Sequence, residues 1–121
     1  MKVLIVEDFD DTRDLLKMIV RLNGCDAAEA TNGQDAIEVA RREQPDLILM
    51  DLNLPILDGW EATRRIHLQK ETSHIPVVAI SAQCVGDWRD RALAAGAREC
   101  MQKPVNVAAM DSLLKRYPAA C

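Results

Sequence analysis

Four short apolar runs recur along the chain, each followed by a longer segment of mixed polarity. They occupy residues 3–6, 47–50 and 77–80, with a weaker run at residues 25–28. Short aliphatic runs without polar alternation are typical of strands that are covered on both faces. The half-polar segment 98–102 fits a fifth strand at an edge of the sheet. The pattern therefore predicts five strands.

The segments between these runs carry apolar residues at helical spacing, which predicts five helices. Side chains suited to helix N-terminal caps stand at Asp10 or Asp11, Asp58, Asp87 and Asn106, and the second helix fits Asn32 to Glu43. The expected buried stripes are Leu15, Ile19 and Leu22 in the first helix, Ala36, Ile37 and Ala40 in the second, and Met110, Leu113 and Leu114 in the fifth. The residues expected to end helices are Gly24, Pro45, Gly96 and Pro118.

Strand and helix alternate five times, which predicts a doubly wound α/β fold. This is one five-stranded parallel sheet with helices on both faces. A length of 121 residues suits one domain, so we expect a single domain over residues 1–121. Hydrophobic residues make up 49% and charged residues 28%, a composition that excludes a disordered tail and a coiled coil.

Charge and aromatic content argue against direct binding of nucleic acid. The net charge is −4, the wrong sign for a protein that follows a phosphate backbone. Aromatic residues are only 3% of the chain, too few for a surface that stacks on bases.

The cysteines and the N-terminus predict a cytoplasmic protein. Its cysteines, Cys25, Cys84, Cys100 and Cys121, are far apart and lack metal-ligand spacing, so we expect reduced thiols. The first apolar run meets Glu7 and Asp8, which leaves it far too short for a signal peptide. No stretch of the sequence is long and apolar enough to predict membrane insertion.

Polar residues with related chemistry stand where the predicted strands end. They are Glu7, Asp8, Asp51, Ser81 and Lys103. Ligands of such sheets bind beyond the carboxyl ends of the strands. Carboxylates gathered there repel one another unless a cation lies among them, and oxygen ligands without His or Cys suit Mg²⁺. Ser81 and Lys103 suit phosphoryl oxygens, and Asp51 is the best candidate for a nucleophile that forms an aspartyl phosphate.

Four stretches in this order resemble the receiver domain of response regulators, the phosphoacceptor module of two-component signalling. They are VLIVEDFDD, PDLILMDLNLPILDGWEATRRI, IPVVAISA and QKPV. The resemblance covers nearly the whole chain and is closest to the single-domain, chemotaxis-regulator type. It implies a flavodoxin-like fold with strand order 2-1-3-4-5.

The resemblance also implies roles for particular residues. Asp51 would be phosphorylated, Ser81 and Lys103 would contact the phosphoryl group, and the Lys103-Pro104 peptide would be cis. The implied Mg²⁺ ligands are Asp8 and Asp51 through their carboxylates, Asn53 through its backbone carbonyl, and Glu7 through a water.

Three further positions are expected to tune the switch. Asn53 and Gln83 would flank the attacking water and set the phosphoryl lifetime, and Ala82 would leave its loop room to move. Cys100 stands where the family usually has Tyr or Phe, which predicts an altered relay. We interpret Cys100 as a small buried hydrophobe, with redox sensing as the alternative.

The predicted function is a phosphorelay switch, not an enzyme. Asp51 would take a phosphoryl group from a phosphohistidine on a sensor kinase or phosphotransfer protein, and output would be altered binding of an unidentified downstream protein. The main alternative is a receiver-like interaction module that works without phosphorylation. A phosphatase built on Asp51 and Asn53, and a flavodoxin-type cofactor carrier, fit less well. Trp88 is either a partner anchor or a cover for the core.

Overall fold

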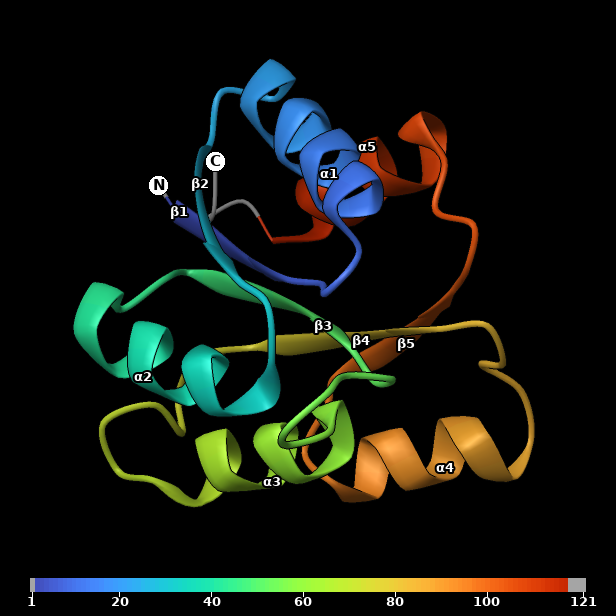
Figure 1. Cartoon of the computed structure of the whole chain (residues 1–121). Helices are drawn as coiled ribbons and strands as arrows, with labels where there is room; N and C mark the ends of the chain where they lie inside the picture. The colour runs from blue at the N-terminus through green and yellow to red at the C-terminus, as the bar shows by residue number, and fades with distance from the viewer. Residues whose placement is uncertain (1, 118–121) are drawn as a thin grey trace.

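The computed structural model describes residues 2–117 and has five strands that alternate with five helices (Figure 1). The elements are β1 (Lys2–Val6), α1 (Asp10–Leu22), β2 (Asp26–Ala30), α2 (Gly33–Glu43), β3 (Leu47–Asp51), α3 (Gly59–Leu68), β4 (Val77–Ser81), α4 (Asp87–Ala94), β5 (Glu99–Gln102) and α5 (Val107–Arg116). All strand pairs are parallel, in the order β2-β1-β3-β4-β5. The predicted fold class and strand order are confirmed.

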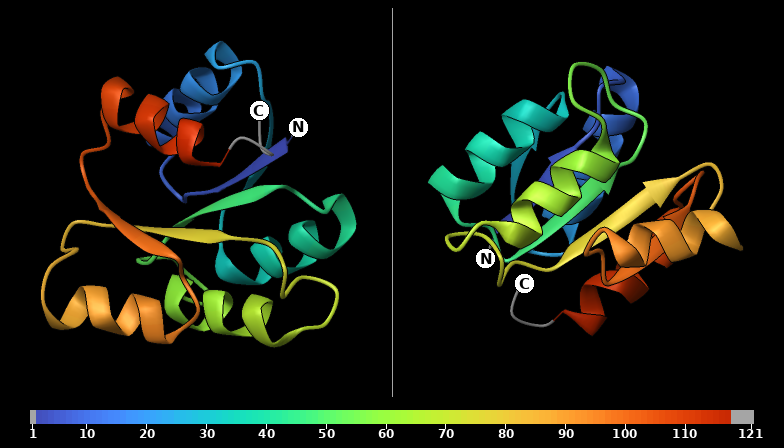
Figure 2. Two further views of the ribbon diagram at one scale, coloured as in Figure 1. Left: turned by 180° about the vertical axis from the view of Figure 1, so that it is seen from behind. Right: turned by 90° about the horizontal axis from the view of Figure 1, so that it is seen from below.

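The sheet lies between two layers of helices. α1 and α5 cover one face, and α2, α3 and α4 cover the other, as the views from the front and from behind both show (Figures 1 and 2). Residues of β1 alternate between the two cores: Val3 and Ile5 pack towards α1 and α5, whereas Leu4 and Val6 pack towards α2 and α3. β3 and β4 are buried along their whole length, as their apolar runs predicted.

The two edge strands fit their sequences less closely. The weak run at residues 25–28 begins one residue before β2 and ends two residues before the strand does, because Cys25 packs into the core ahead of the strand. β2 is Ala-rich and half-polar, so hydrophobicity alone did not define where the strand begins and ends. β5 is a partly buried edge strand, as expected.

Two predicted helix caps are confirmed and two are wrong. Asp58 and Asn106, and also Asn32, each accept a backbone N–H from the residue three positions later. The cap of α1 is Phe9 and that of α4 is Gly86, and neither has a side-chain cap bond. The acids expected to cap these helices lie within their first turns, where they still interact favourably with the helix dipole.

The predicted buried stripe of α1 is also wrong. Ile19 is buried, but Leu15 is 45% and Leu22 is 77% exposed. Leu16 and Val20 take their places in the core, so the buried face is rotated by about one residue. The stripes predicted for α2 and α5 are confirmed.

Two cysteines predicted to be reduced form a disulfide instead. Cys84, in the loop after β4, is bonded to Cys100 on β5, with a Cα–Cα distance of 5.6 Å that suits a disulfide. Cys25 is also disulfide-bonded, and Cys121 lies outside the described residues. The argument for a cytosolic location from reduced thiols is therefore lost.

Within residues 2–117, no helix is long and apolar enough to cross a membrane.

Candidate functional site

The polar residues predicted at the strand ends meet at one edge of the sheet. Glu7 and Asp8 follow β1, Asp51 ends β3 and Ser81 ends β4. Lys103 follows β5, and the Lys103-Pro104 peptide is cis. Four parallel strands thus deliver their terminal side chains to a common place.

Three carboxylates form a compact acidic cluster. One oxygen from each of Glu7, Asp8 and Asp51 lies within 4.8 Å of the other two. Glu7 and Asp51 are each only 3% exposed, whereas Asp8 is exposed. Buried like charges at this spacing repel, so the cluster favours a divalent cation with hard oxygen ligands. By its donor chemistry it fits Mg²⁺.

Lys103 supplies positive charge on one side of this cluster. Its Nζ donates to Asp51 Oδ2 at 3.1 Å and to Glu7 Oε2 at 3.2 Å. Burial on its own lowers the pKa of Lys103, but the Asp51 and Glu7 carboxylates outweigh burial and raise it. The lysine is therefore held as an ammonium beside Asp51.

Glu7 has a strongly raised pKa. Burial raises its pKa to about 7, and the neighbouring Asp51 adds to the rise, while Lys103 opposes it. Near neutral pH the metal-free protein therefore holds a proton on Glu7 in part of its molecules. A bound cation would replace that proton.

This proton makes metal-free stability depend on pH. Because the pKa of Glu7 is raised from 4.5 to about 7, unfolding releases a proton, and stability falls as pH rises through this window. Glu7→Gln is expected to remove the fall and to be more stable than wild type at about pH 8, by on the order of 1–3 kcal/mol. Urea denaturation in the presence of a chelator at several pH values measures this. Glu38→Gln, on the exposed face of α2, is the control, and an unchanged pH slope in Glu7→Gln would contradict the assignment.

Asp51 is held from both sides of its carboxylate. Oδ1 accepts the backbone N–H of Asn53 at 3.0 Å, and Oδ2 accepts Lys103. The side chain of Asn53 is exposed. The strand end is fixed in turn by Gly59, whose N–H donates to the Leu52 carbonyl at 3.1 Å.

A cavity of about 320 Å³ opens beside the acidic cluster. Its lining residues are Asp51, Leu52, Asn53, Trp60, Ser81, Ala82, Gln83, Trp88 and Lys103. Six residues predicted from sequence thus share one cavity, next to Glu7 and Asp8. Cys100 does not line it: this half-buried residue packs against a small cluster of Leu52, Ala79, Ala92 and Ala97.

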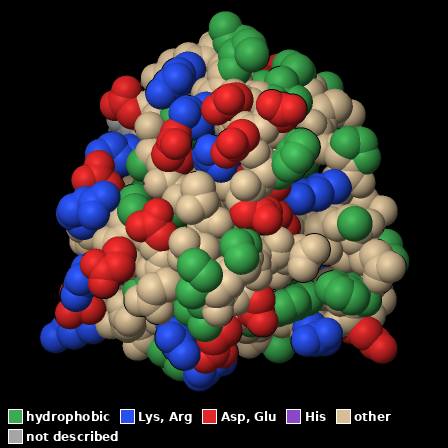
Figure 3. Space-filling model, in the orientation of Figure 1, with side chains coloured by type: hydrophobic (Ala, Val, Ile, Leu, Met, Phe, Trp, Pro, Cys, Tyr) green, Lys and Arg blue, Asp and Glu red, His purple; other side chains and the backbone are tan. Residues whose placement is uncertain are grey.

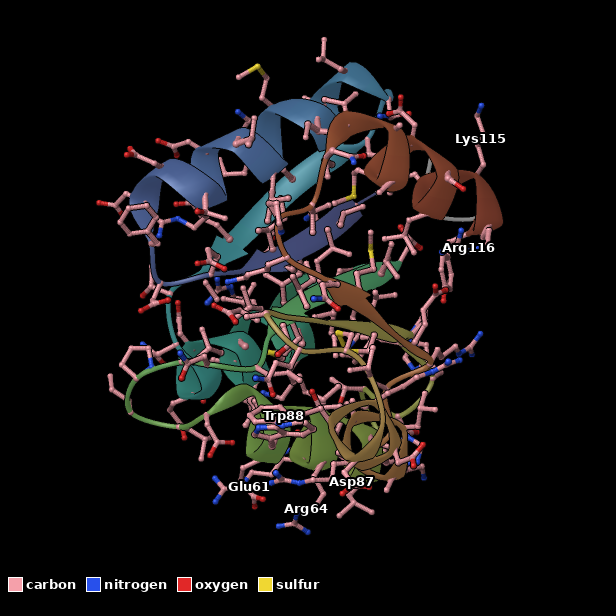
Figure 4. The ribbon with its side chains drawn as sticks, turned by 90° about the vertical axis from the view of Figure 1, so that its right-hand side faces the viewer. Glu61, Arg64, Asp87, Trp88, Lys115 and Arg116 are labelled. Carbon is pink, nitrogen blue, oxygen red and sulfur yellow. A yellow bond between two sulfur atoms is a disulfide. The ribbon has the colours of Figure 1, made fainter. Side chains whose placement is uncertain are left out.

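The aromatic wall of this cavity was not foreseen. The Trp60 and Trp88 rings are 5.6 Å apart and tilted by 47°, and the Arg91 guanidinium lies 4.5 Å from the Trp60 centroid. Trp88 reaches from α4 across to Trp60 on α3, and in Figure 4 it lies above the α3 ribbon, with Glu61 and Arg64 below. At 39% exposure Trp88 covers Trp60 and also meets solvent, and its role as a partner anchor stays a prediction.

Arg13 is a second residue that the sequence did not single out. Its buried guanidinium donates through Nη1 to the Glu7 carbonyl at 3.0 Å and through Nη2 to Asp10 at 2.6 Å. It therefore fixes the backbone that carries Glu7. A lone arginine in a charged helix start gives no signal of this. The neighbouring arginines Arg41-Arg42 and Arg64-Arg65 are all exposed, and basic and acidic side chains interleave along the left of the face in Figure 3.

Fold and site together define a phosphoacceptor module of signalling proteins. Residues 3–115 match the response regulator receiver domain family. The chain belongs to this family, and it is a two-component phosphorylation switch and not a catalytic enzyme. Membership implies a histidine kinase as a partner class.

Individual relatives support this assignment. The polar-differentiation response regulator DivK of Brucella anthropi is 33% identical over 115 residues, which cover 95% of this chain and 94% of that protein. The receiver domain of sensor histidine kinase PA1611 from Pseudomonas aeruginosa PAO1, solved with magnesium in its active site cleft, has a TM-score of 0.89 at 31% identity and covers 98% of this chain and 97% of that one. Chemotaxis protein CheY4 of Vibrio cholerae has a TM-score of 0.90 at 24% identity, with 96% and 97% coverage, and agrees in fold.

Proposed function

We propose that Asp51 accepts a phosphoryl group from the phosphohistidine of a sensor kinase or a histidine phosphotransfer protein. A carboxylate oxygen of Asp51 attacks phosphorus, the phosphorus–nitrogen bond breaks, and the imidazole leaves with a proton. The observation that carries this proposal is the position of Asp51. It lies within hydrogen-bond distance of Lys103 and within 4.8 Å of the Glu7 and Asp8 carboxylates.

We assign Mg²⁺ as the cofactor of this transfer. Asp8 and Asp51 would bind it through carboxylates, Asn53 through its backbone carbonyl, and Glu7 through a water. When bound, it neutralises the acidic cluster and the developing phosphoryl charge. The magnesium in the PA1611 receiver supports this assignment.

The remaining cavity residues complete the proposed switch. Lys103 would pair with one phosphoryl oxygen, and Ser81 would donate its hydroxyl to another. In the unphosphorylated chain the Ser81 Oγ accepts the Gln83 N–H at 3.2 Å. A shift of the Ser81 hydroxyl towards the phosphoryl group would therefore also move the loop after β4. Gln83 and Asn53, both exposed, would set the lifetime by screening attacking water, and Ala82 would let the loop move.

The output would be a change in affinity for a downstream protein. The phosphoryl group adds a charge of about −2 at the cavity and biases the loop and α4 beyond it. We place the protein in the cytoplasm together with its phosphohistidine donor. The single domain is proposed to extend over residues 1–121.

Intact mass tests the phosphoacceptor. Incubation with a small acyl phosphate or phosphoramidate and Mg²⁺ is expected to add the mass of one phosphoryl group, and a chelator is expected to prevent the gain. Asp51→Asn is expected to show no mass gain. Asp26→Asn, at the start of β2 and so at the edge of the sheet away from the site, is expected to keep the gain. No gain in wild type would instead favour the phosphorylation-independent interaction module. An undiminished gain in Asp51→Asn would sink the assignment of the acceptor.

A further inference from the structure

The disulfide between Cys84 and Cys100 spans the part of the fold next to the phosphoacceptor cavity. The two cysteines are 16 residues apart, and the whole of α4 lies between them. Cys84 lies in the loop between β4 and α4, and Cys100 lies on β5. The bond therefore ties the entrance of α4 to the edge strand.

Among the described residues, α4 buries few side chains. Of its eight residues only Ala92 is buried, whereas α5 buries Met110, Leu113 and Leu114. Its N-cap is Gly86, at φ 56°, and no side chain caps it. Its side chains reach α3 through Trp88, whose ring is tilted against the Trp60 ring, and through the Arg91 guanidinium, which lies 4.5 Å from the Trp60 centroid. A helix with so few buried contacts belongs to the least stable part of a fold.

The tied loop also lines the cavity. Ser81, Ala82 and Gln83 all face it, and Cys84 is the next residue. Gln102, on β5, donates from Nε2 to the Ala82 carbonyl at 3.1 Å, and the Lys103 N–H donates to the Ser81 carbonyl at 2.8 Å, so the loop is held to the edge strand by hydrogen bonds as well as by the covalent bond. When the covalent bond is broken, noncovalent contacts alone connect the loop to the edge strand.

We propose that Cys84 and Cys100 form a redox modification site that sets the mobility of this loop and of α4. A small thiol, or a protein with a dithiol, would attack one sulfur and form a mixed disulfide, and a second thiol would release it. The S–S bond takes up two electrons and two protons to give two cysteine thiols. The reductant leaves as a disulfide, and the reverse exchange restores the bond.

Cys84 and Cys100 are both half-buried residues, so neither is sealed in the core. In the oxidised chain the crosslink restricts the open states of the loop. In the reduced chain the loop and α4 open more often. The final step, in which loop mobility alters the phosphoryl lifetime, rests on the proposed function.

Hydrogen exchange followed by mass spectrometry tests the mobility directly. The linked Cys84–Cys100 peptide is first identified without reductant. Dithiothreitol is then expected to speed exchange of the α4 amides by about ten-fold, while β1 and β3 are unchanged. Cys84→Ser/Cys100→Ser is expected to exchange fast with or without reductant. Cys25→Ser is the matched control and keeps the full response to dithiothreitol, which separates this disulfide from the other.

The failures of the two proposals are distinguishable. Asp51→Asn is expected to keep the exchange response while losing phosphorylation. In wild type, the half-life of the phosphoryl group is expected to differ by about three-fold or more between the oxidised and reduced forms. Absence of the linked peptide, equal α4 exchange in both forms, or the same reductant response in the double serine variant would overturn the redox site. An equal half-life in both forms would overturn its coupling to phosphorylation.

Discussion

Lys103→Ala is expected to slow phosphorylation by a small donor about a hundred-fold, the usual effect of removing one preorganised donor from a charged transition state. The Lys103 ammonium lies 3.1 Å from Asp51 and 3.2 Å from Glu7. Its removal leaves two buried carboxylates without their cationic neighbour and removes a donor for the incoming phosphoryl oxygen. Mass spectrometry over time, with saturating Mg²⁺, gives the rate.

Two controls make this result specific. Lys115→Ala removes an exposed lysine at the end of α5, which Figure 4 shows pointing away from the sheet, and is expected to leave the rate unchanged. Urea denaturation of Lys103→Ala shows how much of the variant is folded. A folded Lys103→Ala protein that is phosphorylated at the wild-type rate would remove Lys103 from the proposed mechanism.

Gly59→Ala is expected to destabilise the fold by about 2–4 kcal/mol, because the added methyl group has no room. A Cβ at this position would lie 2.1 Å from the Asp51 carbonyl oxygen and 2.6 Å from the Leu52 Cα. Both are backbone atoms, so α3 or the end of β3 must shift. The shift would move the phosphoacceptor as well, and phosphorylation is expected to fall in the fraction that still folds.

Gly24→Ala separates this clash from ordinary glycine effects. Gly24 has a φ of +83° but nothing within 4 Å of its Cβ position, so alanine there strains only the local backbone. Its expected cost is about 1 kcal/mol. Thermal or urea denaturation of both variants gives the comparison, and equal losses would show that the close approach of Gly59 to β3 is unimportant.

The sequence predicted the buried strands and the helix caps correctly where a residue type has a single physical reason to stand at its position. The runs that became β3 and β4 are apolar throughout because both faces of these strands are covered. The caps Asp58 and Asn106 were recognised because their short polar side chains satisfy helix N–H groups. The wrong side of α1 was predicted to be buried, because the helix has more leucines than the core covers and periodicity does not distinguish Leu15 from Leu16.

In the candidate site, too, some residues could be placed from the sequence and others could not. Asp51 and Lys103 could be brought together from sequence because parallel strands end at one edge. The Trp60–Trp88 wall and the Cys84–Cys100 bond depend on the path of the loop between β4 and α4. No periodicity describes that path, so only the structure places these pairs.

The Trp60–Trp88 pair has a consequence for the fluorescence of the protein. The chain contains only two tryptophans, and both line the cavity beside Asp51. Nearly all of the intrinsic fluorescence of the protein therefore comes from one wall of its phosphoacceptor cavity. The emission should respond to a cation, a phosphoryl group or the redox state of the nearby disulfide. The unlabelled chain carries its own spectroscopic probe at the place where its state changes.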